Sequence, residues 1–312
     1  MPSSLTKPLA LAGGGVPSKP LPRLIYGTAW KKARTQPLVH LALSTGFRAL
    51  DTAAQPRHYA EPDVASALRE AIAQNVVARR DVFVQTKFTP LPGQDPDNVP
   101  YDASAPLADQ VRASVEGSLR NFAVGEAGEE GYIDCLLLHS PLPTLEETLT
   151  AWATMASFVP ERVRRLGISN VSLPMLRALC DAVARSAEPL PKPAAVQNRL
   201  RMGAYEPELY AFCQREGIVF EAFWTLSANP NLLASRPVAE VAAGAGVGRE
   251  VAMYALLLGF DHFVVLDGTT SGEHMREDLE GLEKVGGWAD GEGAELWKAC
   301  VADFKVLMGC EP

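Results

Sequence analysis

A regular alternation of short apolar runs with amphipathic segments is the feature that most constrains the fold of this chain. The apolar runs predict eight strands, over residues 24–27, 47–51, 81–87, 132–139, 163–168, 194–197, 218–223 and 263–266. The intervening segments have helical spacing and predict helices over residues 37–45, 62–74, 108–122, 145–158, 173–187, 206–216 and, in two pieces, 237–258, with closing helices at 273–284 and 294–307. Strands that alternate with helices are parallel and are joined by helical crossovers. Eight of them in 312 residues favour an α/β fold of the TIM-barrel type, a closed (β/α)₈ barrel with closing C-terminal helices.

An open, doubly wound sheet is the main alternative, and such a sheet carries a glycine-rich phosphate-binding turn after its first strand. Here the run 24–27 continues into Thr28-Ala-Trp-Lys31, without a GxGxxG pattern. The glycines at 13–15 precede the first strand and have no helix after them. We therefore expect one barrel domain over residues 1–312.

Composition removes several classes of function. The hydrophobic share of 47% and the charged share of 21% are ordinary for a globular chain, so disordered and fibrous classes are excluded. The net charge of −8, without a block of Lys or Arg, argues against a nucleic acid partner.

No apolar run reaches the ~20 residues that a membrane span needs, and the longest one covers 251–260. The five cysteines are widely spaced and lack a CxxC pair, so we expect reduced thiols, no metal site and a cytoplasmic protein. We also expect a monomer or a weak homodimer, although no sequence feature decides between them.

Polar side chains follow three neighbouring predicted strands, where active sites of such barrels lie. Asp51, Lys87 and His139 end the second, third and fourth strands, and Tyr59 lies in the loop after Asp51. An ammonium favours the phenolate and so lowers the pKa of a nearby tyrosine, an aspartate holds that ammonium in place, and a neutral histidine donates to a carbonyl oxygen. The four types together suit protonation of an oxygen whose carbon accepts a hydride.

Each of these residues also has a simpler interpretation. Asp51 alone would cap a turn, and Tyr59 alone would be a packing aromatic. Lys87 alone would be a solvated charge, and His139 alone a core histidine with satisfied hydrogen bonds. Only their placement on successive strand ends favours catalysis.

Over nearly its whole length the sequence resembles the aldo-keto reductase family. The segment from Gly46 through Asp51-Thr-Ala-Ala resembles the family signature, and Leu24–Trp30 resembles the first strand with its Gly-Thr turn. Tyr59-Ala-Glu61, Val84-Gln-Thr-Lys87 and the run ending in His139 resemble the segments that carry the catalytic residues.

The resemblance implies Tyr59 as the general acid, Asp51 and Lys87 as the groups that tune it, and His139 as the group that polarises the substrate. It implies NADPH as the cofactor, with NADH as the alternative, and a nicotinamide stacked on Phe223. The cofactor residues it implies are Gly27, Thr28, Ser169, Asn170, Gln197, Phe223, Trp224, Thr225, Leu226, Gly268, Thr269, Thr270, His274, Glu277 and Asp278. Trp30, Tyr59, His139 and the loop 88–106 are expected to line the substrate pocket.

The sequence departs from the family pattern at two places. Asp51 and Tyr59 are eight residues apart where the common spacing is five, so 55–57 is interpreted as an insertion, and the adjacent His58 is the alternative acid. After the last strand, the cation that usually binds the ribose 2′-phosphate is missing, and Asp267 would repel a phosphate. The alternative is that hydroxyls and backbone N–H groups at the helix start, together with Arg276, bind the phosphate instead. Glu277 and Asp278 either contact the adenine or only favour a helix N-terminus.

Three functions are compatible with these observations. The first is an NADPH-dependent oxidoreductase that reduces a small carbonyl compound by hydride transfer. The second is a nicotinamide-binding barrel without catalytic activity, resembling the channel-associated subunits of the family. The third is an unrelated barrel hydrolase or lyase, which needs a metal cluster or paired carboxylates at its strand ends, where the sequence offers Asp51 and Asp267.

Overall fold

Eight parallel strands close into a barrel in which each strand pairs with the next along the chain and β8 pairs with β1. The computed structural model describes residues 3–11, 19–124, 131–202 and 205–310. The strands are β1 (Leu24–Gly27), β2 (Ala49–Asp51), β3 (Phe83–Phe88), β4 (Cys135–Leu138), β5 (Leu166–Ser169), β6 (Ala195–Arg199), β7 (Val219–Phe223) and β8 (Phe263–Asp267). The predicted (β/α)₈ barrel is therefore confirmed.

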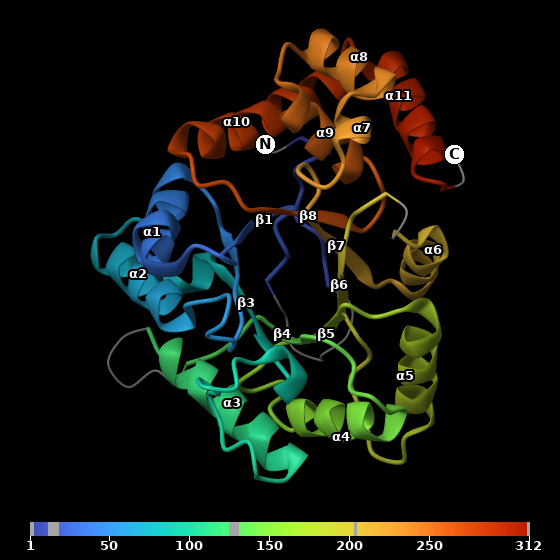
Figure 1. The fold of residues 1–312 in the computed structure, drawn as a ribbon. Helices are drawn as coiled ribbons and strands as arrows, with labels where there is room; N and C mark the ends of the chain where they lie inside the picture. Colours follow the sequence, from blue (N-terminus) through green and yellow to red (C-terminus); the bar gives the residue numbers. More distant parts are fainter. Residues whose placement is uncertain (1–2, 12–18, 125–130, 203–204, 311–312) are drawn as a thin grey trace.

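Helices surround this barrel on its outer side (Figure 1). They are α1 (Thr35–Thr45), α2 (Glu61–Ala73), α3 (Leu107–Asn121), α4 (Leu145–Ala156), α5 (Leu173–Arg185), α6 (Pro207–Glu216), α7 (Pro230–Leu233), α8 (Arg236–Ala245), α9 (Arg249–Leu258), α10 (Gly272–Ala289) and α11 (Ala294–Leu307). The two closing helices predicted at the C-terminus are α10 and α11, and α11 has the bounds that the sequence predicted.

Several strands are shorter than their apolar runs. The run 81–87 begins as a 3-10 turn over Arg79–Asp81, and pairing starts at Phe83. The run 132–139 pairs over Cys135–Leu138. The apolar runs therefore extend beyond the hydrogen-bonded strands into buried connecting segments. Side chains in these segments do not pair in the sheet but still pack against the surrounding helices.

The interior of the barrel changes character along its axis. At the amino-terminal end, Leu11 and Leu21 pack with Ile25, Phe83 and other strand residues in one buried apolar cluster. Leu21 also forms an antiparallel bridge with Leu9, so the N-terminal segment closes this end. Toward the carboxyl ends of the strands the inward side chains become polar, and Asp51, Lys87 and Glu221 are buried there.

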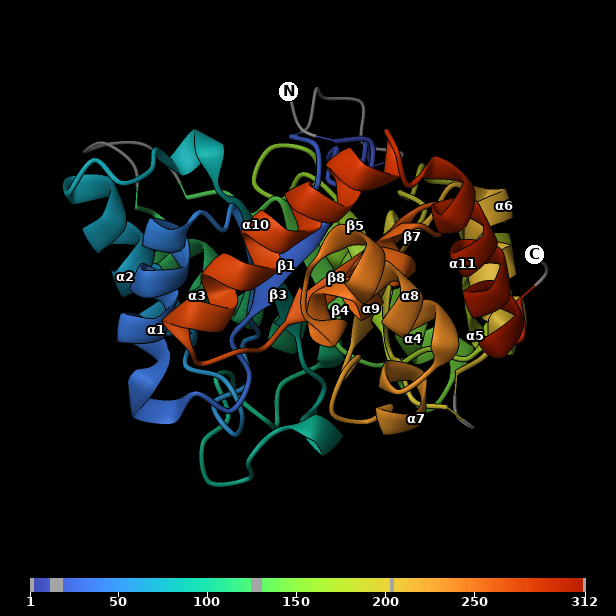
Figure 2. The ribbon, with the colours of Figure 1, turned by 90° about the horizontal axis from the view of Figure 1, so that it is seen from above.

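Figure 2 shows the two ends of the barrel apart, with the N-terminal segment 3–11 at one end and α7 at the other.

In the part of the chain that the structure describes, no single helix has the length and apolar character to cross a membrane. Only the bent pair α8 and α9, with 105° between its helices, meets that criterion when taken together.

Candidate active site

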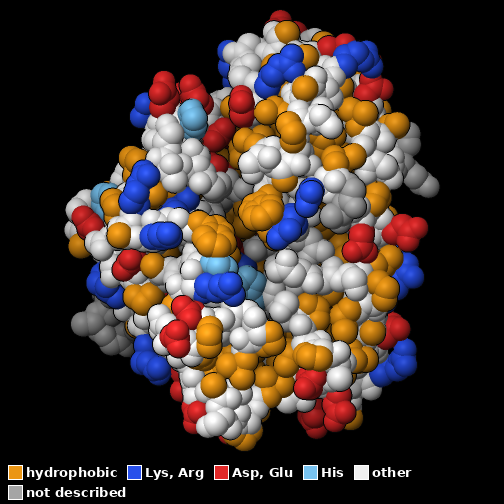
Figure 3. Space-filling view, in the orientation of Figure 1, with side chains coloured by type: hydrophobic (Ala, Val, Ile, Leu, Met, Phe, Trp, Pro, Cys, Tyr) orange, Lys and Arg blue, Asp and Glu red, His pale blue; other side chains and the backbone are white. Residues whose placement is uncertain are grey.

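A cavity of about 1210 Å³ lies at the carboxyl ends of the strands, which is larger than the ~300–1,000 Å³ of most small-ligand sites. Of the site residues predicted from the sequence, all except Thr28 and Lys87 line it. Thr28 lies below the surface, where its hydroxyl donates to the Asp51 carbonyl over 2.8 Å. In the space-filling view down the barrel, hydrophobic and basic side chains surround the central hollow (Figure 3).

Lys87 and Asp51 form a buried ion pair beneath the cavity floor. The Lys87 ammonium lies 2.6 Å from Asp51 Oδ2 and also donates to the Thr52 carbonyl over 2.9 Å. Burial by itself would lower the pKa of Lys87, but Asp51 and Tyr59 outweigh burial and raise it. Because the carboxylate holds the ammonium charged and fixed, Lys87 presents a permanent positive charge to the cavity floor.

Tyr59 lies above this pair despite the insertion before it. The extra residues form a turn in which the Tyr59 N–H donates to the Gln55 carbonyl over 3.0 Å, and Gln55 is tied to the Gly93 carbonyl. The ring centroid of Tyr59 is 4.9 Å from the Lys87 ammonium. Burial raises the pKa of the phenol, and Lys87 opposes that rise without cancelling it. The net shift is therefore upward, where the sequence predicted a lowered pKa, because desolvation of a phenolate outweighs one neighbouring cation.

His139 completes the group. Its ring packs edge-on against the Tyr59 ring at a centroid distance of 5.9 Å. Burial and the Lys87 charge lower the pKa of His139 to about 3, so the ring is neutral at physiological pH. Its Nδ1 lies 2.6 Å from Thr89 Oγ1. When the Thr89 hydroxyl donates to Nδ1, the ring proton lies on Nε2, which is then a hydrogen-bond donor.

A second buried carboxyl, Glu221, was not foreseen from the sequence. Gln85 and Gln197 each donate from one amide group to both Asp51 and Glu221, with donor–acceptor distances of 2.6–3.0 Å. Burial raises the pKa of Glu221 to about 7. The sequence did contain a sign of this buried polar group, because Gln85 and Glu221 are polar residues at inward-facing positions of otherwise apolar strands.

Aromatic side chains line the mouth of the cavity. Trp30 and Trp224 are 58% and 47% exposed, and both have positive φ angles. Trp30 stacks on His58 at 3.7 Å between ring centroids, and the Arg199 guanidinium lies 4.1 Å from the Trp224 ring. These flat surfaces suit planar ligand groups.

No residue of the loop 88–106 lines this cavity, but Asn98 and Pro100 line an adjoining pocket that shares Tyr59, so the expected part of this loop in the substrate pocket stays a prediction. Gln94 donates to the Ala54 and Thr89 carbonyls, and the Tyr101 hydroxyl also donates to the Thr89 carbonyl. These bonds hold the loop against the segment after β2. Instead, the junction of α8 and α9 at 246–248, together with Tyr254, forms a wall that sequence patterns did not reveal.

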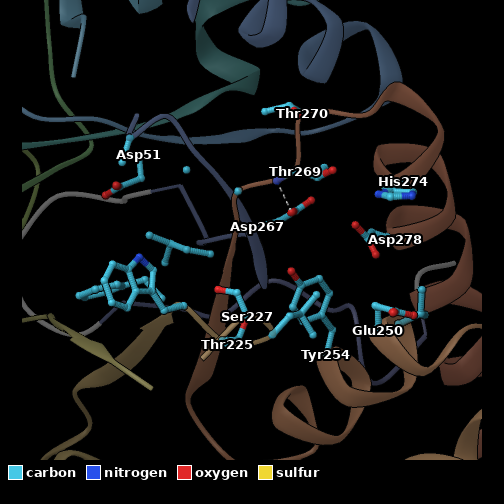
Figure 4. Close-up of a pocket in the computed structure, with 18 of the residues that line it drawn as sticks. Asp51, Thr225, Ser227, Glu250, Tyr254, Asp267, Thr269, Thr270, His274 and Asp278 are labelled. Carbon is cyan, nitrogen blue, oxygen red and sulfur yellow. Dashed lines mark hydrogen bonds between the residues drawn. The ribbon is translucent and has the colours of Figure 1, made fainter. Parts of the chain in front are cut away.

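The cavity extends away from Asp51 to a second group of polar residues (Figure 4). Asp267 at the end of β8 and Asp278 on α10 face one another there, below His274. Burial and the neighbouring Asp267 raise the pKa of Asp278 to about 8, and burial also raises the pKa of Asp267. The two carboxyls therefore hold a proton between them near neutral pH.

The end of the cavity near Tyr59 fits a nicotinamide ring. Phe223 offers an aromatic face, and Ser169 and Asn170 offer a hydroxyl and an amide to a carboxamide group. Ser169 Oγ donates to the Gln197 carbonyl over 2.7 Å, and Asn170 Nδ2 donates to the His139 carbonyl over 2.9 Å, so both side chains are fixed in orientation. Among the residues that the structure describes, no group of three or more His, Cys, Asp or Glu could hold a metal ion.

Fold and cavity together define the class: a (β/α)₈ barrel with a large ligand cavity at the carboxyl ends of its strands. The sequence profile of the Aldo/keto reductase family matches residues 23–233, and the chain belongs to that family.

Curated relatives are distant in sequence. The oxidoreductase YtbE of Bacillus subtilis (strain 168) is 26% identical over 237 residues, which cover 76% of this chain and 73% of YtbE. The 2,5-diketo-D-gluconic acid reductase B of Corynebacterium sp. (strain SHS752001) is 28% identical over 66% of this chain and 64% of its own length. Methylglyoxal reductase DkgA of Salmonella typhimurium is 27% identical over 52% of this chain, and the match spans half of that enzyme.

Solved structures share the fold. An aldo-keto reductase from a Medee basin deep-sea metagenome library superposes with a TM-score of 0.66 at 19% identity, covering 86% of this chain and 92% of its own. An aldo-keto reductase solved in complex with NADPH gives a TM-score of 0.65 at 17% identity, covering 90% and 88% of the two chains. At these identities the likeness concerns the fold.

Proposed function

We propose that this protein reduces an aldehyde or ketone to the corresponding alcohol. The reaction consumes one carbonyl compound, one reduced nicotinamide dinucleotide and one proton, and it yields the alcohol and the oxidised dinucleotide. The observation that carries this proposal is the group formed by Tyr59, Lys87, Asp51 and His139 at the floor of one cavity.

Tyr59 is proposed as the general acid. When bound, the reduced nicotinamide supplies the hydride to the carbonyl carbon. Burial keeps the phenol protonated before the reaction, since its pKa is raised. As negative charge develops on the carbonyl oxygen, the Lys87 ammonium stabilises the phenolate that remains after the proton leaves. Asp51 is a positioning residue in this scheme, because it holds Lys87.

His139 is proposed to orient the substrate. A neutral imidazole donates one hydrogen bond to the carbonyl oxygen without competing for the proton of Tyr59. Trp30 lines the same side of the cavity. The names of the relatives, methylglyoxal reductase and diketogluconic acid reductase, support a small carbonyl compound as the substrate. A cytoplasmic location is also proposed, because free cysteines such as those of this chain are typical of proteins in a reducing compartment.

The test is the Tyr59→Phe variant, with His58→Gln as its matched control. Cofactor oxidation in the presence of a panel of small aldehydes and ketones should fall by about 10²–10⁴-fold in Tyr59→Phe, while cofactor binding followed by tryptophan fluorescence is retained. His58→Gln should keep most activity, because the His58 ring packs against Trp30 and is not part of the group formed by Tyr59, Lys87, Asp51 and His139. Full activity in Tyr59→Phe would assign the acid to another residue. Binding without oxidation in the wild type would favour the regulatory barrel instead.

A further inference from the structure

The end of the cavity distant from Tyr59 is rich in carboxyl groups. Five carboxyl side chains line this end, against two amino groups among the described lining residues: Glu250, Asp267, Glu277, Asp278 and Glu280 against Lys31 and Lys284. Even with one proton held between Asp267 and Asp278, negative charge is in excess here. Figure 4 shows Asp267, Asp278 and Glu250 on the far side of the cavity from Asp51. A dinucleotide with its nicotinamide beside Tyr59 would therefore place its adenine ribose toward this end.

Asp267 accepts a hydrogen bond from the backbone of the loop that follows it. Its Oδ1 accepts the Thr269 N–H over 2.8 Å, and further along the loop the Ser271 and His274 N–H groups are taken by the side chains of Thr269 and Ser271. These three backbone donors are therefore satisfied within the chain and are not free to bind an external phosphate. Asp267 Oδ2 is buried and has no donor other than the Asp278 carboxyl, with which Asp267 shares a proton.

The two amino groups at this end already donate hydrogen bonds to backbone carbonyls. The Lys31 ammonium donates to the carbonyls of Gly268 and Thr269 over 3.0 and 3.4 Å and lies 4.7 Å from the Tyr26 ring centroid. The Lys284 ammonium donates to the Gly246 carbonyl over 2.8 Å. A phosphate would have to draw them away from these carbonyls.

One feature favours an anion here, and it is weaker than the carboxyls. Helix α10 begins at Gly272, and Ser271 is its N-cap residue. A helix N-terminus carries about half a positive charge, and Glu273 already lies in the first turn. Half a charge does not offset an excess of carboxylates at the same end of the cavity.

We propose that this end of the cavity binds an adenine ribose whose 2′-hydroxyl is free, so that the protein prefers NADH to NADPH. This inference rests on the proposed function. A ribose hydroxyl donates to a carboxylate of the cavity lining, such as Glu277 or Glu280, whereas a 2′-phosphate brings two negative charges against these carboxyls. The resemblance to the family implies NADPH, and the 2′-phosphate of NADPH does not fit the charges of this chain.

The experiment is a set of calorimetric titrations of the full chain with four probes. NAD⁺ and NADP⁺ test the whole dinucleotide, while 5′-AMP and 2′,5′-ADP test the ribose end without a nicotinamide. We expect the two probes without a 2′-phosphate to bind at least about tenfold more tightly than their partners. Glu277→Gln, which removes one negative charge from the cavity lining, should tighten NADP⁺ and 2′,5′-ADP severalfold and leave 5′-AMP nearly unchanged. Glu292→Gln, which removes an exposed charge outside the cavity lining, should change none of the four.

Each outcome bears on the inference separately from the reaction. If 2′,5′-ADP binds as tightly as 5′-AMP or more tightly, the inference is overturned, even when NADPH-dependent reduction proceeds. If NAD⁺ and 5′-AMP are preferred but no carbonyl compound is reduced, the inference is supported and the proposed activity fails. Absence of binding by all four probes overturns both.

Discussion

Asp51 on β2 and Glu221 on β7 are bridged across the interior of the barrel by the same two amide groups. Gln85 Nε2 lies 3.0 Å from Asp51 Oδ1 and 2.6 Å from Glu221 Oε2, and both distances from Gln197 Nε2 are 2.9 Å. The strand register explains this, since Gln85 pairs with Asp51 and Gln197 pairs with Glu221. A change of charge on Glu221 is therefore transmitted to the carboxylate that holds Lys87.

Glu221→Gln is expected to flatten the pH dependence of stability. Burial raises the pKa of Glu221 from 4.5 to about 7. Between these values the folded protein holds a proton that the unfolded chain releases, so the free energy of unfolding falls as pH rises through this window, by about 3 kcal/mol in all. Urea unfolding at pH 5 and pH 8 measures this fall. A variant that loses as much stability as the wild type over that range would contradict the assignment to Glu221.

Lys87→Met is expected to destabilise the fold as well as to abolish activity. It leaves the Asp51 carboxylate buried without its cation, which costs about 3–5 kcal/mol. The double variant Asp51→Asn/Lys87→Met removes both charges and should recover most of that loss, while activity stays absent. Denaturant unfolding of the two variants separates these effects. Equal destabilisation of the single and the double variant would show that packing, rather than charge, is responsible.

Thr89→Val is expected to lower kcat by about tenfold through the orientation and tautomer of His139. The Thr89 hydroxyl is 2.6 Å from Nδ1 of that ring, and valine preserves the shape but not the hydrogen bond. Thr89→Ser, which restores a hydroxyl, is the matched control and should recover activity. Steady-state kinetics with one carbonyl substrate measures both variants, and unchanged kcat in Thr89→Val would remove this role.

The ring of His139 is expected to stay neutral over the working pH range. Its pKa is lowered to about 3 by burial and by Lys87. Its imidazole carbon-bound proton signals in an NMR titration should therefore not shift between about pH 5 and 8, where an unperturbed histidine titrates near 6.5. In Lys87→Met the midpoint should rise, since one of the two causes is removed. A wild-type midpoint above pH 6 would contradict a neutral hydrogen-bond donor.

Much of the fold could be predicted from the sequence, because burial on both faces of parallel strands leaves short apolar runs that stand out from amphipathic helices. The pattern predicted all eight strands. It placed the ends less well, since apolar side chains such as Ile133 are buried outside the ladder. It did not reveal that Gln94 ties the loop 88–106 to Ala54, because composition carries no information on such contacts.

The sequence by itself determined the barrel and the order in which polar groups end its strands, since both follow from local patterns of burial. Only the tertiary structure decided how those groups act on one another. The upward pKa shift of Tyr59, the bridge from Asp51 to Glu221 and the acidic far end of the cavity all join residues distant along the chain. Desolvation and Coulomb interactions depend on distances through space, and those are fixed only when the barrel closes.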